Sequence, residues 1–402
     1  MNQDEILQLL SADREDAFRT LLQESLNSVL TAESQEQLQA APYERSEGRT
    51  DSRSGFRTRD LKTRIGTITL NVPRHRNQPF HTMVFENYSR SEAALVTAMA
   101  EMVVSGVSTR KAAKVIETLC GTSVSKSAVS DVCKDFDHEV ETFRNRPIEG
   151  NYPFLTVDAT YFKVRENRRV VLKALMIAYD DRKREILGFS AYRNESRETW
   201  KDFLTGLKKR GLCGLMMITS DAHDGIINAA REVFPDVPWQ RCQFHFSKNI
   251  ADKAPKKEQA GLCAELQEMF NCKKIEYARQ KRDQILADYQ ESVSSAMECL
   301  YEGFESAMTF MTLPEGMRRF FRTSNHIERL NRELKRRSGV IGIFPNEASL
   351  IRLMGSVLME QNSISQARKA IFSKGSYQGL LKSDVRNHLH LIAEEQAALL
   401  AA

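Results

Sequence analysis

Three acidic side chains in this chain have the type and setting to bind divalent metal ions. Asp158 lies inside the apolar, β-rich run LTVDATYFKVR, Asp221 follows the apolar run MMITS, and Glu328 lies near the start of SNHIERLNRELKRR. Mg²⁺ prefers oxygen ligands and keeps much of its water, so two or three convergent carboxylates are enough to hold it. Two such ions can activate a nucleophile and stabilise the leaving oxygen in phosphoryl transfer. The pattern predicts metal-dependent chemistry on phosphate esters.

Taken singly, each of these acids has an ordinary structural explanation. An Asp at the end of a strand is usually a turn residue or a helix cap, and Asp221 could cap the helix that follows it, a role for which Asp224 competes. Glu328 and Arg332 stand four residues apart, so they could form an exposed ion pair on a helix. Convergence of the three carboxylates would distinguish a metal site from these alternatives.

The elements around the two aspartates predict a mixed sheet covered by helices. Residues 153–250 indicate three successive strands, an amphipathic helix ending at Gly211, a short buried strand and a second helix. This order fits an α/β domain. If the first and fourth strands are neighbours, Asp158 and Asp221 stand at one edge of the core.

The third acid lies on a predicted helix that begins near Ser324. Glu328 shares one face of this helix with Arg332 and Lys335. The core-facing stripe is predicted to consist of Ile327, Leu330 and Leu334. Glu328 would then point away from the stripe that anchors its helix.

Positive charge is concentrated in two windows of an otherwise balanced chain. The chain has 402 residues, 41% hydrophobic and 28% charged, and a net charge of only +5. Residues 43–76 hold nine basic and four acidic residues, and residues 318–337 hold eight and two. Such patches indicate a polyanion partner, with nucleic acid the first candidate, although a single basic run is more often a solvated surface.

The chain divides into seven stretches by composition and periodicity. They are an N-terminal helical segment (1–42), a basic Arg-rich segment (43–90), a helix-turn-helix-like DNA-binding region (91–145), the first part of the α/β core (150–250), an all-helical insertion (251–320), the last part of the core with the Glu328 helix (321–365) and a C-terminal tail (366–402). Residues 43–80 of the basic segment could be partly disordered until they meet DNA. An ordinary helical hairpin explains region 91–145 about as well as a helix-turn-helix.

Several stretches, in this order and spacing, resemble the Mutator-type family of bacterial insertion-sequence transposases. They are VDATYFKVR, TSDAHDG, WQRCQFH and SNHIERLNRELKRR, with GVSTRKAAKVIETLCG and YERSEGR upstream, so the resemblance spans about residues 40–360. Two small departures are Phe56, where a tyrosine is common, and the extra basic charge of Arg329 and Arg332.

The resemblance implies a DDE recombinase whose catalytic domain has a ribonuclease-H-like fold. By this resemblance Asp158, Asp221 and Glu328 match the two aspartates and the glutamate of the family, and would hold two Mg²⁺ ions, for which Mn²⁺ would substitute. The implied reaction is metal-dependent cleavage at transposon ends, followed by attack of the liberated 3′-hydroxyl on target DNA.

Cys242 and His245 match the Cys-x-x-His motif of the family. A zinc site would need two more ligands, which the neighbouring sequence does not supply. We therefore expect these residues to have a structural role or to position the transposon end. Trp239 could stack on a base there or lie buried in the core. The seven cysteines are scattered and form no CxxC pair, which argues against a disulfide framework.

The expected partner is double-stranded DNA, both terminal inverted repeats and target, bound by a homodimer or larger oligomer. The residues expected to bind DNA are Lys163, Arg165, Arg329, Arg332, Lys335, Arg336, Arg337, Arg110 and Lys126. No apolar run approaches the ~20 residues that cross a bilayer and no secretory signal is recognisable, so we expect a cytoplasmic, nucleoid-associated bacterial protein without a membrane partner. Two alternatives stay open: a nuclease of the same fold that does not join DNA, and a catalytically inactive DNA-binding repressor.

Overall fold

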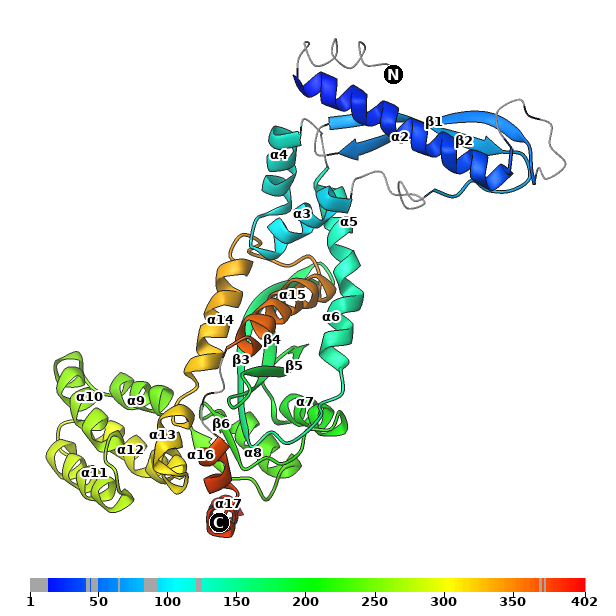
Figure 1. Cartoon of the computed structure of the whole chain (residues 1–402). Coiled ribbons are helices and arrows are strands. Elements are labelled where there is room, and N and C mark those ends of the chain that lie inside the picture. The colour runs from blue at the N-terminus through cyan, green and yellow to red at the C-terminus, as the bar shows by residue number, and fades with distance from the viewer. Residues whose placement is uncertain are drawn as a thin grey trace. The chain divides into compact units, whose positions relative to one another are not determined.

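Two compact units make up the chain, Met1–Asp135 and Phe136–Ala402 (Figure 1). The computed structural model describes residues 14–40, 44, 50–63, 66–82, 93–120, 125–368, 371 and 374–401. Asp158, Asp221 and Glu328 all belong to the second unit, so the candidate chemistry lies within one unit.

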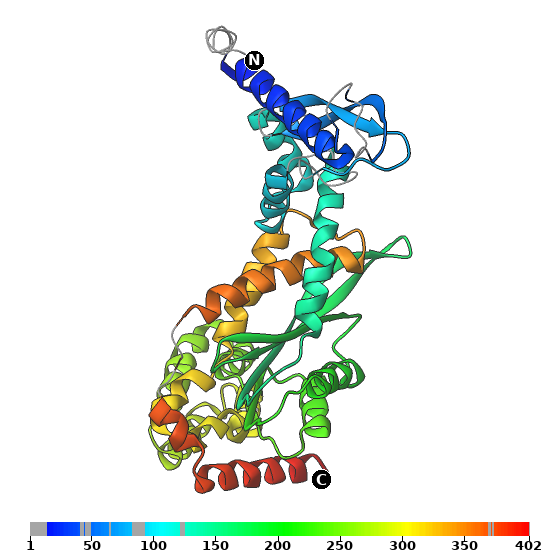
Figure 2. The same cartoon turned by 45° about the vertical axis from the view of Figure 1, so that its right-hand side comes forward.

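A long helix packs on a two-stranded antiparallel hairpin in the first unit (Figure 2). These elements are α2 (Arg14–Leu38), β1 (Arg53–Thr63) and β2 (Gly66–His75). Alternate residues of β2 are buried, and Ile68, Leu70 and Val72 pack with Leu30 of the helix. In the described strands α2 covers the apolar face of the hairpin, while the partial disorder expected for residues 43–80 before they meet DNA stays a prediction.

Short helices follow in the same unit and share a small core. They are α3 (Ala93–Val104), α4 (Thr109–Cys120), α5 (Lys126–Val132) and the 3₁₀ helix η1 (Cys133–Asp135). The core they share includes Met99, Ala112, Ile116 and Val129. The helices predicted for this region are confirmed, and their helix-turn-helix function stays a prediction.

A five-stranded mixed sheet is the centre of the second unit. Its strands are β3 (Phe154–Glu166), β4 (Arg169–Asp180), β5 (Glu185–Tyr192), β6 (Met217–Ser220) and β7 (Trp239–Arg241). The order is β5-β4-β3-β6-β7, antiparallel from β5 to β3 and parallel from β3 to β7. The strand and helix order predicted for residues 153–250 is confirmed, as is the mixed sheet.

Helices cover both faces of this sheet (Figure 2). The helices concerned are α6 (Phe136–Asn145), α7 (Arg197–Lys209), α8 (Asp224–Val233) and α15 (Glu347–Gln366). On one face, Leu155 and Val157 of β3 pack with Trp200 of α7. On the other, Gly355 of α15 approaches α6 so closely that a Cβ there would lie 2.4 Å from a methyl group of Val140.

An all-helical insertion between β7 and α13 has its own hydrophobic core (Figure 1). Its elements are α9 (Gln243–Asp252), α10 (Lys256–Phe270), α11 (Ile275–Tyr289), α12 (Ser294–Ala307) and the 3₁₀ helix η2 (Thr309–Thr312). Phe246, Leu262 and Phe304 are completely buried within it. The helical character predicted for residues 251–320 is confirmed.

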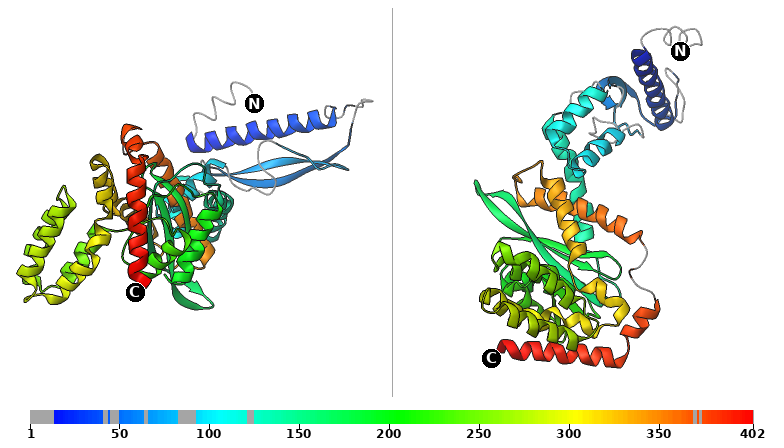
Figure 3. Two further views of the ribbon diagram at one scale, coloured as in Figure 1. Left: turned by 90° about the horizontal axis from the view of Figure 1, so that it is seen from below. Right: turned by 90° about the vertical axis from the view of Figure 1, so that its left-hand side faces the viewer.

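The last part of the chain packs back onto the sheet domain. It contains α13 (Glu315–Phe321), α14 (Asn325–Ser338), α15, α16 (Lys374–Leu380) and α17 (Ser383–Ala401). Residues 366–402, expected to be a tail, thus carry two helices, whose Leu380 and Leu389 share a core with Phe154. α17 runs alongside the end of the insertion, and Gln396 accepts the N–H of Trp239 at 2.9 Å (Figure 3). None of the helices in the described residues is long and apolar enough to cross a membrane.

Candidate active site

Asp158 lies on β3, and Asp221 directly follows β6, the parallel neighbour of β3. Thr156 of β3 pairs with Thr219 of β6, and each aspartate comes two residues after its threonine. This register places the two carboxylates at the same level of the sheet. The first and fourth strands are neighbours in the sheet, which is the condition under which the two aspartates were expected at one edge of the core.

Asp158 is held by a donor from a distant part of the sequence. Its Oδ2 atom accepts a hydrogen bond from Nδ2 of Asn331 at 2.7 Å, and its Oδ1 accepts the N–H of Ala159 at 2.9 Å. Burial raises the pKa of Asp158 to about 7, and the charge of Asp221 adds to this effect. Bringing a cation between the two carboxylates would relieve this repulsion.

Asp221 keeps one buried oxygen without a donor. The cap of α8 is His223, which accepts the N–H of Gly225, so capping does not occupy the carboxylate. Among the described residues, Oδ1 of Asp221 has no hydrogen-bond partner. Burial raises the pKa of Asp221, against the opposing charge of His245. An all-oxygen site with an unpartnered buried carboxylate oxygen fits a hard divalent cation such as Mg²⁺.

Glu328 lies in the first turn of α14, and this helix is fixed against β3. The predicted core stripe is confirmed by the burial of Ile327, Leu330 and Leu334. One turn after Glu328, Asn331 donates the hydrogen bond that reaches Asp158. In place of the ion pair considered with Arg332, Oε1 of Glu328 accepts a hydrogen bond from the hydroxyl of Ser324 at 3.0 Å.

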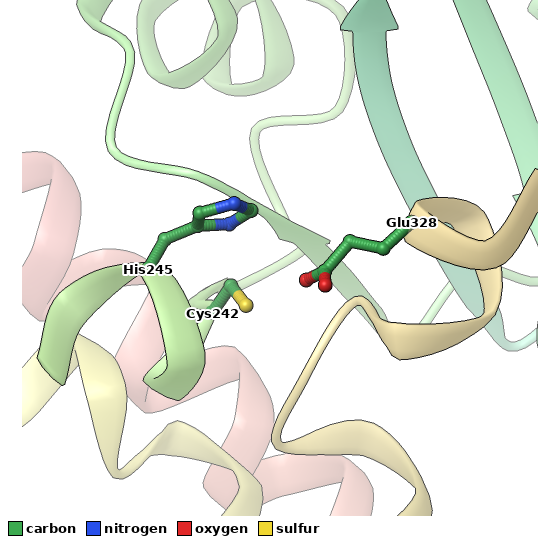
Figure 4. A group of neighbouring side chains, drawn as sticks. All are labelled: Cys242, His245 and Glu328. Carbon is green, nitrogen blue, oxygen red and sulfur yellow. The ribbon is translucent and has the colours of Figure 1, made fainter. Parts of the chain in front are cut away.

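Cys242 and His245 meet Glu328 next to the aspartates. Cys242 follows β7 and is completely buried, and the carboxylate of Glu328 points from α14 toward it and toward the ring of His245 (Figure 4). One ligand atom from each of the three residues lies within 4.8 Å of the others. A zinc site at Cys242 and His245 would need two further ligands that the neighbouring sequence does not offer. In the fold, Glu328 of α14 lies where one of them would be needed.

The electrostatic environment links this trio to the aspartates. Contact with Cys242 raises the pKa of His245 to about 9 in spite of burial, and the charges of Glu328 and Asp158 contribute. Burial alone would raise the pKa of the Cys242 thiol, but His245 and Ser324 lower it overall. The acidic neighbours thus favour the protonated form of His245 when no metal is bound.

Trp239 is a core residue. Its side chain is 5% exposed, and the indole N–H donates to Oγ of Ser220 at 2.9 Å. Of the two interpretations of this residue, the geometry favours burial over stacking on a base.

Three neighbours of the site were missed by the reasoning from sequence. Asn331 could have been found from the sequence, because it follows Glu328 by three residues and so lies on the same helical face. No sequence pattern pointed to Glu195 or Tyr161, because only the folded sheet brings them to Asp221. Burial raises the pKa of Tyr161 to about 12, helped by Glu195, and burial also raises the pKa of Glu195, with Asp221 adding to it.

Six of the predicted DNA-binding side chains are exposed on the elements that carry the acids, and two of these, Lys335 and Arg336, also have protein partners. Lys163 and Arg165 lie on β3 beyond Asp158, and Arg329 and Arg332 lie on α14. In the first unit, Arg110 is exposed on α4, while the side chain of Lys126 lies outside the described residues. These positions suit contact with a phosphate backbone.

The other basic residues of α14 have protein partners. Lys335 donates to the backbone oxygen of Tyr161 on β3, and Arg336 pairs with Glu333 at 2.7 Å. Arg337 is only 6% exposed and binds both Glu333 and Glu360. Because its guanidinium holds α14 to α15, Arg337 has little surface for a phosphate, and the DNA-binding role expected for it is withdrawn.

Comparisons with known proteins cover almost the whole of this architecture. A family model described as "Transposase, Mutator family" matches residues 2–367. The transposase for insertion sequence element IS256 in transposon Tn4001 of Staphylococcus aureus is 42% identical over 366 residues, 89% of this chain and 94% of that protein. The transposases for ISRM5 of Rhizobium meliloti and IS1081 of Mycobacterium tuberculosis are 38% and 36% identical, over 86% of this chain and 87% and 85% of theirs.

Among solved structures, the Drosophila P element transposase strand transfer complex matches 75% of this chain and 84% of that chain. The TM-score is 0.31 at 11% identity, too low a similarity to support an argument about the fold.

Proposed function

The chain belongs to the Mutator family of transposases, and on this basis we propose that it is a DDE transposase that cuts DNA at transposon ends and joins them to target DNA. The observation that carries the proposal is the convergence of Asp158, Asp221 and the helix of Glu328, tied together by the hydrogen bond from Asn331 to Asp158 at 2.7 Å. Three antiparallel strands extended by two parallel ones support a ribonuclease-H-like fold for this domain.

Asp158, Asp221 and Glu328 would hold two Mg²⁺ ions, with Mn²⁺ as a substitute. The mutual repulsion of the aspartates and the unpartnered Oδ1 of Asp221 support this assignment. When bound, such ions supply Lewis-acid stabilisation of the charge on the attacking and leaving oxygens. The residues themselves set the geometry: Asn331 orients the carboxylate of Asp158, and Ser324 orients that of Glu328.

The reaction consists of two phosphoryl transfers. In the first, a water oxygen bonds to the phosphorus at the transposon end, and the bond to the 3′-oxygen breaks, which leaves a 3′-hydroxyl. In the second, that hydroxyl attacks a phosphodiester of the target and displaces its 3′-oxygen. No covalent protein–DNA bond forms, so no Ser or Tyr nucleophile is required.

The DNA would lie across the elements that carry the acids. Lys163 and Arg165 extend β3 beyond Asp158, and Arg329 flanks Glu328, so their exposed cations would meet the backbone near the scissile phosphate. The helices α3 to α5, with Arg110 and Lys126, would recognise the inverted repeats. Two ends must be joined, which calls for a homodimer or larger oligomer on DNA in the bacterial cytoplasm.

The test is incubation of the full chain with labelled DNA flanking the gene and a target plasmid, with and without Mg²⁺. We expect metal-dependent nicks and joined products with the wild type, and neither with Asp158→Ala. Nicking without joining, over a range of ends and targets, would replace the proposal with a nuclease. Binding without cleavage by both proteins would replace it with a repressor.

A further inference from the structure

A second set of metal ligands lies beside the carboxylates and differs from them in chemistry. The Sγ of Cys242, a ring nitrogen of His245 and a carboxylate oxygen of Glu328 all lie within 4.8 Å of one another (Figure 4). A tetrahedral zinc site with bonds of 2.0–2.3 Å separates its ligand atoms by roughly 3.5 Å. The separations between the ligand atoms would therefore need to shrink by about 1.3 Å at most.

These ligands are held on fixed elements. The N–H of Cys242 donates to the backbone of Ser220 on β6 at 2.8 Å, and His245 follows in the first turn of α9, on the same side as Cys242. Ser324, itself 3% exposed, lies with its hydroxyl 3.1 Å from Sγ of Cys242 and 3.0 Å from Oε1 of Glu328. A hydroxyl that orients two ligands at once is what a metal site needs in its surroundings.

One polar atom among Cys242, His245 and Glu328 makes no hydrogen bond in the described part of the chain. Nδ1 of His245 is buried and has no hydrogen-bond partner among the described residues. Histidines buried for structural reasons normally donate or accept at both ring nitrogens. The ring of His245 lies beside the thiol of Cys242 and the carboxylate of Glu328 (Figure 4), which supports a role for His245 as a ligand.

We propose that Cys242, His245 and Glu328 form a binding site for a thiophilic divalent metal of the Zn²⁺ type. Sulfur and imidazole ligands select Zn²⁺ over Mg²⁺, which prefers oxygen and sheds water reluctantly. Three protein ligands leave the fourth tetrahedral position to water. The two sites are thus distinguished by their ligand chemistry, and they share Glu328.

Because both sites use Glu328, metal binding at the zinc site would affect DNA cleavage; this step rests on the proposed function. Glu328 points toward Cys242 and His245 (Figure 4). The contact of α14 with Asp158 comes instead from the side chain of Asn331. A carboxylate bound to Zn²⁺ cannot also complete the Mg²⁺ site in the same geometry. Zn²⁺ would therefore inhibit DNA cleavage by withdrawing Glu328 from Asp158 and Asp221.

Cobalt is the probe for the site, because a thiolate bound to Co²⁺ gives an intense charge-transfer absorption. We expect metal-free, full-length protein to bind one Co²⁺ with this band, and Zn²⁺ to abolish it. Cys242→Ser should lose the band. Cys263→Ser, a control at an exposed thiol on α10, should keep it, as should Asp158→Asn. A folded wild type without the band, or an unchanged band in Cys242→Ser, would overturn the proposal.

Glu328→Gln provides a second variant at a half-buried position, should Cys242→Ser not fold. Its Zn²⁺ affinity should fall by at least about tenfold, and an unchanged affinity would overturn the assignment of Glu328. A cleavage assay in Mg²⁺ then separates the two proposals. Absence of cleavage without zinc contradicts the proposed function alone, while cleavage that one equivalent of Zn²⁺ leaves unchanged overturns the inhibitory role.

Discussion

Two pairs of aspartates on the same sheet differ in what surrounds them. Asp180 and Asp181 are buried at the end of β4, where Asp181 accepts a hydrogen bond from the hydroxyl of Thr156 and Asp180 accepts the N–H of Lys183. Their partners come from the same turn and the adjacent strand. Asp158 and Asp221 instead meet residues from α9 and α14, far away in the sequence.

Burial and unpartnered oxygens do not separate the two pairs. Burial raises the pKa of Asp180 to about 6 and that of Asp158 to about 7, and each pair contains one buried oxygen without a donor among the described residues. What differs is convergence, because the amide of Asn331 and the charges of His245 and Glu195 reach the Asp158 pair. We therefore expect Asp158 and Asp221 to act in catalysis and Asp180 and Asp181 to stabilise the fold.

The largest expected effect is on catalysis at the convergent pair. Asp158→Asn keeps the size of the side chain and removes its charge, so we expect DNA cleavage to fall by at least roughly 10³-fold, about 4 kcal/mol of transition-state stabilisation. Single-turnover cleavage assays measure this. Asp202→Asn, at an exposed acid on α7, is the matched control and should leave the rate within about twofold of wild type.

The other pair should respond in stability. Thr156→Val removes the hydroxyl that donates to Asp181 and leaves a buried carboxyl without that donor, so the free energy of unfolding should fall by about 1–3 kcal/mol. Denaturant unfolding measures the loss, and cleavage per folded molecule should stay near wild type. A large loss of cleavage in a fully folded Thr156→Val protein would break the comparison.

The pH dependence of stability should also distinguish the site. The pKa of Asp158 is about 7 when folded, above the ~3.9 of an unfolded chain, so the folded state binds more protons between these values. Its contribution to the free energy of unfolding therefore falls as pH rises from about 4 to about 7, by about 1–2 kcal/mol at this half-buried position. Thermal unfolding of metal-free Asp158→Asn and wild type should be measured across this pH range. The free energy of unfolding should change less steeply with pH in the variant. An identical slope would contradict the assigned shift.

The smallest effects concern DNA binding by α14. Arg332→Gln removes an exposed cation, so affinity should fall several-fold and the slope of log K against log salt should decrease by about 1. Arg337→Gln breaks buried pairs with Glu333 and Glu360 and should lower stability while leaving the salt slope unchanged. Fluorescence anisotropy over a salt series compares the two variants. Equal effects of both on the slope would mean that burial of Arg337 does not decide its role.

Local patterns predicted much of the second unit. The strands around Asp158, the helix stripe of Ile327 and the helical insertion all follow from periodicity, which reports burial directly. Asp158 stood out because it interrupts an apolar run, Asp221 because it follows one, and Glu328 because it lies in a strongly basic helix. Resemblance to a family then linked them before any contact was known.

What the sequence could not predict are contacts made by tertiary packing. Glu195 approaches Asp221 only because β5 and α7 are joined beside it, and the meeting of Glu328 with Cys242 depends on how α14 crosses the sheet. The burial of Arg337 was missed because a basic run gives no sign of which member faces a neighbouring helix. The packing of Leu30 in α2 on Ile68 and Leu70 of β2 was not predicted, because the two elements are far apart in the sequence.

The most direct test of the account is to measure Mn²⁺ binding near neutral pH in the wild type, Asp221→Asn and Thr156→Val. Electron paramagnetic resonance counts the bound ions without the need for an active DNA substrate. We predict that the wild type and Thr156→Val bind Mn²⁺ alike and that Asp221→Asn loses at least one ion. Equal binding by wild type and Asp221→Asn would contradict the claim that the convergent acids form the metal site.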